Sequence, residues 1–224
     1  MSQFFADPQS IGDYAARTAR LVPGLFDMQR MAALLLAERA PPDARLLIVG
    51  AGGGLELMMF AQLQPAWHFT GVDPSSPMLA QAKSTLGTQA TRVDWHQGYV
   101  DTAPSGPFDG ACCLLTLHFV EEGERARTLA EIHRRLKPGA PFVVMHLSFE
   151  QTEPARSLWL DRYVAYAVSS GVEPAKARTA ADTIGAQVPV LSPERDEALM
   201  RAAGFSHIDL FFTGLAFRGW VTRA

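Results

Sequence analysis

The sequence predicts an α/β fold built on a doubly wound, mostly parallel sheet. The first observation is an apolar strand over residues 46–49 that runs directly into a glycine-rich turn, Gly50 to Gly54. The second is a helical run over residues 55–63, followed by another apolar strand that ends in Asp73. The third is that strand-like and helix-like segments keep alternating to the C-terminus. Strand, glycine turn, helix and acid-ending strand together are typical of a nucleoside-binding βαβ unit.

The remaining elements follow from periodicity and from helix start and stop signals. Ser75 or Ser76 can cap a helix, and Gly87 can end it. Lys137-Pro138-Gly139 stops an amphipathic helix, while Ser192-Pro193 starts a late one that ends at Gly204. The predicted helices cover residues 27–39, 55–63, 75–87, 122–136, 154–170, 174–186 and 192–204. The predicted strands cover residues 46–49, 69–73, 91–96, 108–117 and 141–147, with an antiparallel pair at 207–212 and 215–221. The sequence thus predicts seven strands, one of them antiparallel to the rest.

One domain with four parts is expected over residues 1–224. Residues 1–42 are predicted to form an N-terminal helical cap, and residues 43–149 the cofactor-binding core. Residues 150–190 interrupt the α/β alternation with two helical patterns and are predicted to form a helical lid. Residues 191–224 supply the C-terminal helix and hairpin.

Composition limits the classes of function. The chain is 48% hydrophobic over 224 residues, enough for a substantial core, and its net charge of −3 makes a nucleic-acid partner unlikely on electrostatic grounds. Cys112 and Cys113 are adjacent in an apolar run, which indicates buried small hydrophobes rather than a disulfide. The start of the chain lacks a basic n-region, and no apolar stretch reaches membrane-spanning length. We therefore expect a cytoplasmic protein without a membrane partner, and the sequence is compatible with a homodimer.

The glycine spacing separates two kinds of nucleoside cofactor. A dinucleotide fingerprint would need its third glycine at Leu55, whereas here the glycines fall at Gly50, Gly52 and Gly54. This spacing argues against a nicotinamide-dependent oxidoreductase, which stays as an alternative that a binding comparison would decide. Asp73 is placed to accept hydrogen bonds from ribose hydroxyls; in the alternative interpretation it only caps the following helix.

Four successive motifs carry a resemblance to a known superfamily. They are Gly50-Ala51-Gly52-Gly53-Gly54, Val72-Asp73-Pro74-Ser75, Phe108-Asp109-Gly110 and Leu136-Lys137-Pro138-Gly139. In this order they resemble the motifs of class I S-adenosylmethionine (SAM)-dependent methyltransferases, which have a Rossmann-like fold. The flanks, among them Arg20 to Gly24 and Phe217 to Val221, most resemble the branch that contains the carboxy-SAM synthase of tRNA wobble-uridine modification.

The resemblance implies a set of cofactor-binding residues, with SAM as cofactor and S-adenosylhomocysteine (SAH) as product. The donor would contact the glycine turn and pair its ribose with Asp73, with Pro74 beside the adenine. Tyr99 and Val100 would flank the base, and Leu114 and Leu115 would line the floor under the sulfonium. The full implied set is Arg20, Gly50, Ala51, Gly52, Gly54, Asp73, Pro74, Tyr99, Val100, Leu114 and Leu115.

The chain also departs from the family pattern. Ile48 stands where an acid commonly lies, and Tyr99 replaces an aspartate that often contacts the adenine; Asp101 is a candidate substitute. Leu199 and Leu25 stand where the carboxy-SAM branch has an arginine and a tyrosine. Because a carboxylate without a cation is costly in an apolar pocket, the departures predict ordinary SAM rather than carboxy-SAM as donor.

Methyl transfer needs little from the protein beyond alignment, because the sulfonium already activates the methyl group. Where the acceptor must lose a proton, His118 and His146 are the candidate catalytic bases, since His118 lies just past the fourth predicted strand and His146 near the end of the fifth. In the alternative interpretation they are structural histidines. No spacing of Cys, His, Asp or Glu predicts a metal site.

The predicted acceptor is a small organic molecule held beneath the lid. Trp159, Tyr163 and Tyr166 share one helix face there, and Phe26 is expected to pack from the N-terminal side. Alternatively, the aromatic face only packs on the core. RNA stays an alternative acceptor, because one predicted helix carries four arginines: Arg125, Arg127, Arg134 and Arg135. The glutamates interleaved with them suggest instead that this is a solvated helix face. The sequence also leaves open a non-catalytic SAM- or SAH-binding protein or a methyltransferase related to tRNA modification.

Overall fold

The computed structural model describes residues 14–224, so the first part of the predicted N-terminal cap and the chain's first residues lie outside the described part. Seven strands form one sheet in the order β3-β2-β1-β4-β5-β7-β6. They are β1 (Arg45–Val49), β2 (His68–Asp73), β3 (Val93–Gln97), β4 (Gly110–Leu114), β5 (Pro141–Leu147), β6 (Ser206–Gly214) and β7 (Phe217–Arg223). The first five strands pair in parallel, and β7 pairs antiparallel with both β5 and β6. The predicted doubly wound sheet with one reversed strand is confirmed.

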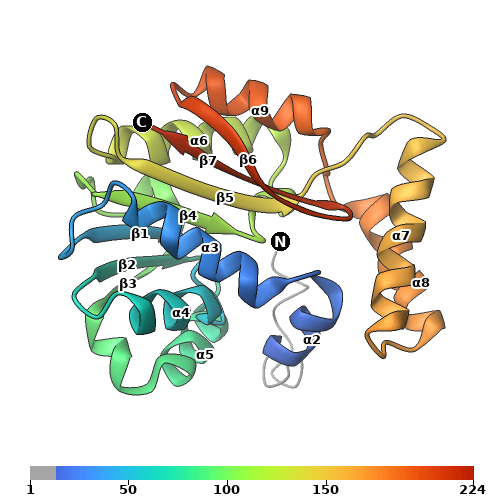
Figure 1. Ribbon diagram of the computed structural model, residues 1–224, viewed down its shortest axis with the longest axis horizontal. Helices are drawn as coiled ribbons and strands as arrows, with labels where there is room; N and C mark the ends of the chain where they lie inside the picture. Colours follow the sequence, from blue (N-terminus) through green and yellow to red (C-terminus); the bar gives the residue numbers. More distant parts are fainter. Residues whose placement is uncertain (1–13) are drawn as a thin grey trace.

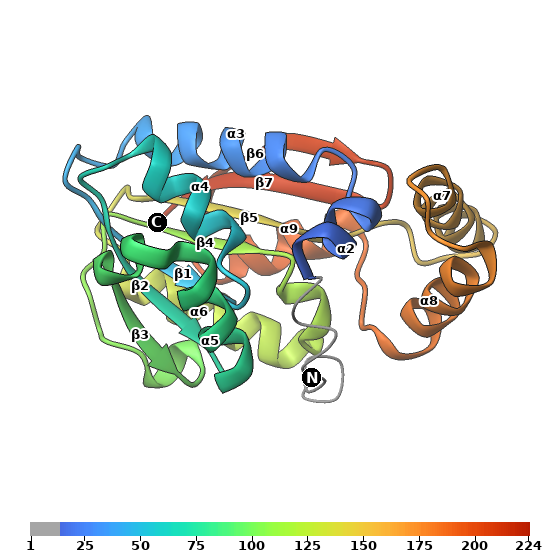
Figure 2. The same ribbon diagram turned by 90° about the horizontal axis from the view of Figure 1, so that it is seen from below.

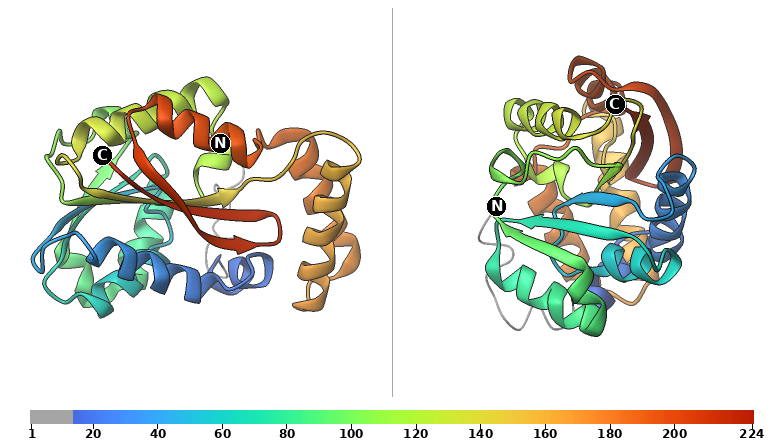
Figure 3. Two further views of the ribbon diagram at one scale, coloured as in Figure 1. Left: turned by 45° about the horizontal axis from the view of Figure 1, so that its top comes forward. Right: turned by 90° about the vertical axis from the view of Figure 1, so that its left-hand side faces the viewer.

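Helices cover both faces of the sheet (Figure 1, Figure 3). The α-helices among the described residues are α2 (Tyr14–Leu21), α3 (Leu25–Ala37), α4 (Leu55–Leu63), α5 (Ser76–Leu86), α6 (Glu122–Arg135), α7 (Ala155–Ser169), α8 (Pro174–Gln187) and α9 (Pro193–Ala202). Short 3-10 helices are η1 (Gly87–Arg92), η2 (Val100–Thr102) and η3 (Leu117–Phe119). Successive strand residues pack on opposite sides: Leu46 and Ile48 face the cluster under α3 and α4, whereas Leu47 and Val49 face the cluster that includes Leu129 of α6 and Met200 of α9.

Local signals explain where several helices begin and end. The hydroxyl of Ser75, rather than that of Ser76, accepts the backbone N–H of Met78 and caps α5. Ser192 caps α9 in the same way through the N–H of Arg195. The apolar run at residues 108–117 predicted a longer strand than β4, which covers Gly110–Leu114, because the chain leaves the sheet there and residues 117–119 form η3.

Residues 150–190 form an excursion from the sheet. Its two ends are joined at the base, where the N–H of Phe149 donates to the carbonyl of Leu191. Helices α7 and α8 pack on each other as a pair that stands beyond the end of the sheet (Figure 1, Figure 2). The pair contacts the rest of the molecule through α2 and through Tyr163, whose ring lies 6.5 Å from that of Phe217 on β7.

Candidate functional site

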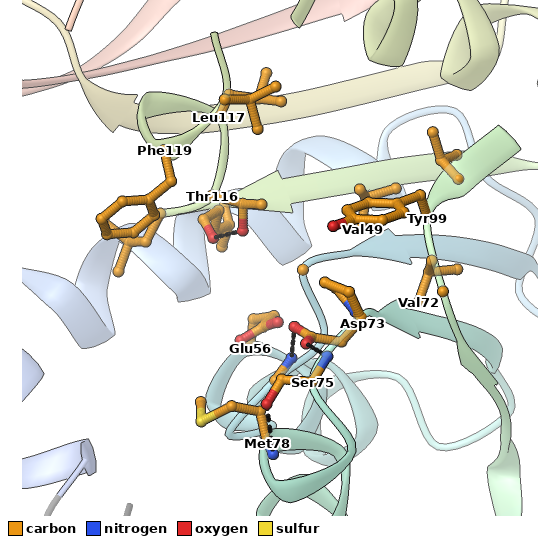
Figure 4. A pocket seen from close by; sticks show the side chains of 18 of the residues that line it. Val49, Glu56, Val72, Asp73, Ser75, Met78, Tyr99, Thr116, Leu117 and Phe119 are labelled. Atoms are coloured by element: carbon orange, nitrogen blue, oxygen red, sulfur yellow. Dashed lines mark hydrogen bonds between the residues drawn. The ribbon is translucent and has the colours of Figure 1, made fainter. Parts of the chain in front are cut away.

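A cavity of about 450 Å³ opens at the carboxyl ends of β1, β2 and β4 (Figure 4). Open α/β sheets bind ligands at this edge, and the volume lies within the range of small-molecule sites. The lining residues come from the glycine turn, from the ends of the strands, from α2, α3, α4 and α5, from η2 and η3, and from Thr128 of α6. Among the residues predicted to bind cofactor, the lining includes Gly50, Gly52, Asp73, Pro74, Tyr99, Val100, Leu114 and Leu115.

The end of β2 and the glycine turn are joined by Asp73. One carboxylate oxygen accepts the backbone N–H of Gly52 at 3.0 Å, and the other accepts that of Ser75 at 2.8 Å. A side chain on Gly52 would collide with this carboxylate, because an added Cβ would lie 2.7 Å from its nearer oxygen. Burial raises the pKa of Asp73, while the two hydrogen bonds act in the opposite direction. Both oxygens keep further lone pairs for a ligand, so the capping interpretation and the ribose interpretation are compatible.

Gly54 and Ala51, also predicted to bind cofactor, do not line the cavity. Gly54 adopts a left-handed conformation with φ of 72°, and an added Cβ would lie 2.9 Å from the Cα of Ala82. The third glycine therefore allows α4 and α5 to approach each other rather than making room for the ligand. Ala51 is completely buried beneath the turn.

The opposite end of the cavity offers surfaces for a planar base. The Tyr99 ring lies near Val49 at the wall of the cavity, and 58% of the residue is exposed (Figure 4). Val100 begins η2, and the buried Arg135 of α6 holds this turn by donating to the carbonyls of Asp101 and Ala103 at 2.8 and 3.2 Å. Asp101 itself does not line the cavity, so it is not positioned as the substitute acceptor suggested by the sequence.

Three polar residues at the glycine-turn end were missed by the sequence analysis. Tyr14, Gln29 and Glu56 line the cavity from α2, α3 and α4, and Glu56 is only 7% exposed. Burial raises the pKa of Glu56 to about 8 and that of Tyr14 to about 12. The sequence did hold a signal for Glu56: it is the one charged residue in the mainly apolar helix LELMMFAQL.

Arg20, the remaining residue of the predicted cofactor set, lies in the last turn of α2, where its side chain is exposed and outside the cavity lining. The residues around Arg20 resemble the family pattern. In the structure, however, the Arg20 side chain is exposed and does not line the described pocket. No described residue that lines the cavity is a lysine, arginine or histidine.

The two predicted catalytic histidines are buried and lie outside the cavity lining. Nδ1 of His118 accepts the backbone N–H of Leu147 at 3.4 Å, and burial lowers the pKa of His118 well below its usual range. Nε2 of His146 lies 3.2 Å from a carboxylate oxygen of Asp196 on α9. Both side chains point into the protein because η3 and β5 turn them toward α9, and the placement favours the structural interpretation over the catalytic one.

The four predicted substrate residues also lie outside the cavity lining. Tyr163 is buried against Phe217, and the Trp159 ring is covered by the guanidinium groups of Arg162 and Arg218, at 4.4 and 5.0 Å. Tyr166, one turn further along α7, is half-buried, and Phe26 on α3 is 51% exposed. Most of this stripe therefore holds α7 against its neighbours, as the packing alternative supposed.

Two positions that guided the prediction of donor choice belong to the core. Leu199 of α9 is 7% exposed among the side chains between α9 and the sheet, and Leu25 is 2% exposed at the start of α3. Neither residue lines the cavity. Discrimination against a carboxylated donor therefore depends on the residues that do line the cavity.

The basic helix α6 is not uniformly solvated, contrary to the sequence interpretation. Arg125 and Arg135 are buried, with exposures of 0% and 1%, while Arg127 and Arg134 pair with Glu124 and Glu131 on the surface. Because two of the four guanidinium groups hold internal contacts, α6 presents no cluster of four free cations to RNA.

Other features bear on alternative classes of function. Cys112 and Cys113 are free and buried, as predicted. Within residues 14–224, no helix is both long and apolar enough to cross a membrane, and no group of three His, Cys, Asp or Glu side chains is arranged to hold a metal ion.

Comparison with known proteins adds a family match over the core. Residues 46–139 match the family model described as a methyltransferase domain. The chain is 27% identical to a carboxy-SAM synthase of Aeromonas hydrophila over 95% of this chain and 87% of the relative. It is 28% identical to a carboxy-SAM synthase of Methylococcus capsulatus over 98% of this chain and 95% of the relative.

Solved structures share the fold at low sequence identity. An O-methyltransferase family protein from Burkholderia thailandensis aligns with a TM-score of 0.69 at 13% identity, over 99% of this chain and 61% of that one. Human N-acetylserotonin methyltransferase aligns with a TM-score of 0.60 at 16% identity, over 97% of this chain and 59% of that one. The chain thus spans less than two thirds of each of these structures. The match to a methyltransferase domain over residues 46–139 and the shared fold agree with the class predicted from the motifs, that of class I SAM-dependent methyltransferases.

Proposed function

We propose that this class I SAM-dependent methyltransferase transfers the methyl group of SAM to a small organic acceptor by direct displacement at the sulfonium. The observation that carries the proposal is the cavity at the strand ends, which combines the Asp73–Gly52 contact with a mainly apolar lining. In this proposal the ribose hydroxyls bond to Asp73, the adenine lies between Pro74 and the Tyr99–Val100 segment, and Leu114 and Leu115 lie under the sulfonium. The protein then contributes alignment and exclusion of water, while the donor supplies the activated methyl group.

The nature of the acceptor is supported by size and charge. The cavity has a volume of about 450 Å³, the described lining holds no lysine or arginine, and α6 offers few free cations for a phosphate backbone. These features favour a small molecule over RNA. We assign the approach of the acceptor to the side of the cavity lined by Tyr14, Phe119 and Val120. The α7–α8 pair packs on α2, which carries Tyr14, and would form an outer wall there.

The names of the curated relatives raise a second candidate, synthesis of carboxy-SAM. For this chain the proposal keeps ordinary SAM as donor, because the described lining contains two carboxylates, Glu56 and Asp73, and no cation to pair with a third. An unpaired carboxylate in such a site would be strongly disfavoured.

Methyl-labelled SAM distinguishes the candidates in one experiment. The protein is incubated with labelled SAM, a small-molecule extract and bulk tRNA, and the fractions are separated by mass. Label in a small molecule supports the proposal, whereas label in tRNA would replace it with a tRNA-modifying function. A donor heavier by one carboxyl group would establish carboxy-SAM synthesis. SAH binding without any transfer would leave a regulatory SAM- or SAH-binding protein.

A further inference from the structure

The glycine-turn end of the cavity is acidic and lacks a compensating cation. Glu56 and Asp73 lie on the same wall, and their carboxyl groups are close together in Figure 4. Burial is the largest cause that raises the pKa of Glu56, and the negative charge of Asp73 adds to it. Because no Lys, Arg or His lines the described cavity, the buried Glu56 and the half-buried Asp73 are left to be neutralised by protons or by a ligand.

A second polar group at the same end lacks a partner. Gln29 of α3 is 2% exposed and lines the cavity, and its buried Oε1 accepts no hydrogen bond from any residue between 14 and 224. Buried amide oxygens are almost always satisfied, so this one is best explained by a donor that arrives with the ligand. Glu56 and Gln29 come from two packed helices, α4 and α3, and together they offer a charged and a neutral acceptor.

We propose that Glu56 and Gln29 form the receptor for the α-ammonium group of the methionine part of SAM. An ammonium group carries three N–H donors and one positive charge, so it satisfies the orphan amide oxygen and neutralises the buried carboxylate at once. The inference rests on the proposed function, since it assumes that SAM occupies the cavity. The assignment also explains why Ile48 can stand where the family commonly has an acid. Here the negative charge comes from Glu56 in the helix after the glycine turn instead of from the strand before it.

The groups around Glu56 do not compete for the same proton near neutrality. Tyr14 on α2 and Cys113 on β4 each have a pKa raised by burial to about 12, and that of Cys112 is raised as well. The Asp73 carboxyl has its pKa raised from an ordinary value of 3.8. Burial raises the pKa of Glu56 to about 8, so its charge is expected to change near this pH.

Ligands with and without the ammonium group test the assignment. SAH carries it, and 5′-methylthioadenosine has the same nucleoside but ends at the thioether. We expect Glu56→Gln to weaken SAH binding in calorimetry by about tenfold or more, the usual size of a lost charge-assisted bond, and to leave 5′-methylthioadenosine within about twofold. Gln29→Leu should act in the same direction. The matched control is Glu124→Gln on the surface of α6, which should change neither ligand.

The pH profile gives an independent readout. In the wild-type protein, SAH affinity should rise by about tenfold between pH 6.5 and 8.5 as Glu56 loses its proton more readily, whereas the profile of Glu56→Gln should be nearly flat. Retained 5′-methylthioadenosine binding shows that the variant is folded. The inference is overturned if Glu56→Gln weakens both ligands equally, or if it leaves SAH affinity and its pH profile unchanged. If neither ligand binds the wild-type protein, the proposed function fails first, and this inference with it.

Discussion

The guanidinium of Arg125 on α6 lies 2.6 Å from the carboxylate of Asp196 on α9, with both side chains almost completely buried. The same carboxylate accepts the hydroxyl of Ser148 at 2.7 Å, and Arg125 also donates to the carbonyl of Pro189 at 2.7 Å. Ser148 and Pro189 flank the excursion that carries α7 and α8. The ion pair therefore joins α6, α9 and both ends of that excursion at one point.

Breaking the pair from one side should be strongly destabilising. We expect Asp196→Asn to lower the free energy of unfolding by about 3–5 kcal/mol, because Arg125 would remain as a buried charge without its partner. Urea denaturation measures this directly. The exposed pair Arg127–Glu124 provides the control, with an expected loss below about 1 kcal/mol for Glu124→Gln. Similar losses for the two variants would contradict the buried pair's role.

Acid should weaken the fold through His118. Its pKa is held well below 6.5 by burial, so in the unfolded chain it binds a proton below about pH 6.5 while in the folded chain it stays neutral. Since the unfolded state then binds more protons, the stability contribution is complete above pH 6.5 and is lost as the pH falls below it. We expect the midpoint of thermal unfolding to depend less on pH between 5 and 7 in His118→Asn, which cannot titrate there. An unchanged pH slope would refute this assignment.

Removing the Asp73 carboxylate should weaken both SAM and SAH. The expected loss is about ten- to a hundredfold for Asp73→Ala, which corresponds to a charge-assisted hydrogen bond to the ribose. Asp94→Ala, on the exposed surface of β3, is the matched control. Unchanged SAH affinity in calorimetry would overturn the ribose assignment, provided that the melting temperature shows Asp73→Ala to be folded.

Carboxy-SAM should bind more weakly than SAM. The added carboxylate would enter a cavity whose described lining holds Glu56 and Asp73 and no cation. A competition assay compares the two donors at equal concentration. Effective displacement of SAM by carboxy-SAM would contradict the expected donor choice and would favour the activity in the names of the curated relatives.

Substitutions of the aromatic residues of α7 should affect protein stability and acceptor turnover to different extents. Tyr163→Ala is expected to destabilise the protein by about 2–4 kcal/mol, because the ring is buried against Phe217. Trp159→Ala removes a half-buried ring beside Arg218 and should cost less. If α7 forms an outer wall of the acceptor site, Trp159→Ala lowers acceptor turnover while SAH affinity stays within about twofold. Unimpaired turnover would restrict α7 to a packing role.

The amino-acid sequence by itself determined the order and type of the elements and the edge of the sheet at which the candidate site lies. Hydrophobic periodicity sets which residues enter the sheet, and the glycine turn and Asp73 must meet because parallel strands end at one edge. These are local or topological constraints, so they can be derived without coordinates. The resemblance of the motifs to a known family then named eight residues that line the cavity, among them Gly52, Tyr99 and Leu114.

Only the tertiary structure decided which polar side chains face the ligand. His118 follows β4 and His146 lies near the end of β5, and both strands end at the correct edge, yet both side chains are buried outside the cavity, while Glu56 in an apolar helix lines it. Arg125 looks solvated in its helix and instead pairs with Asp196, which is 71 residues away in the sequence. Side-chain direction depends on the packing of elements that are distant in the chain, and desolvation and charge then depend on those neighbours. A sequence pattern does not contain the distances between such neighbours, so only the fold decided the direction, burial and charge environment of the polar side chains at the candidate site.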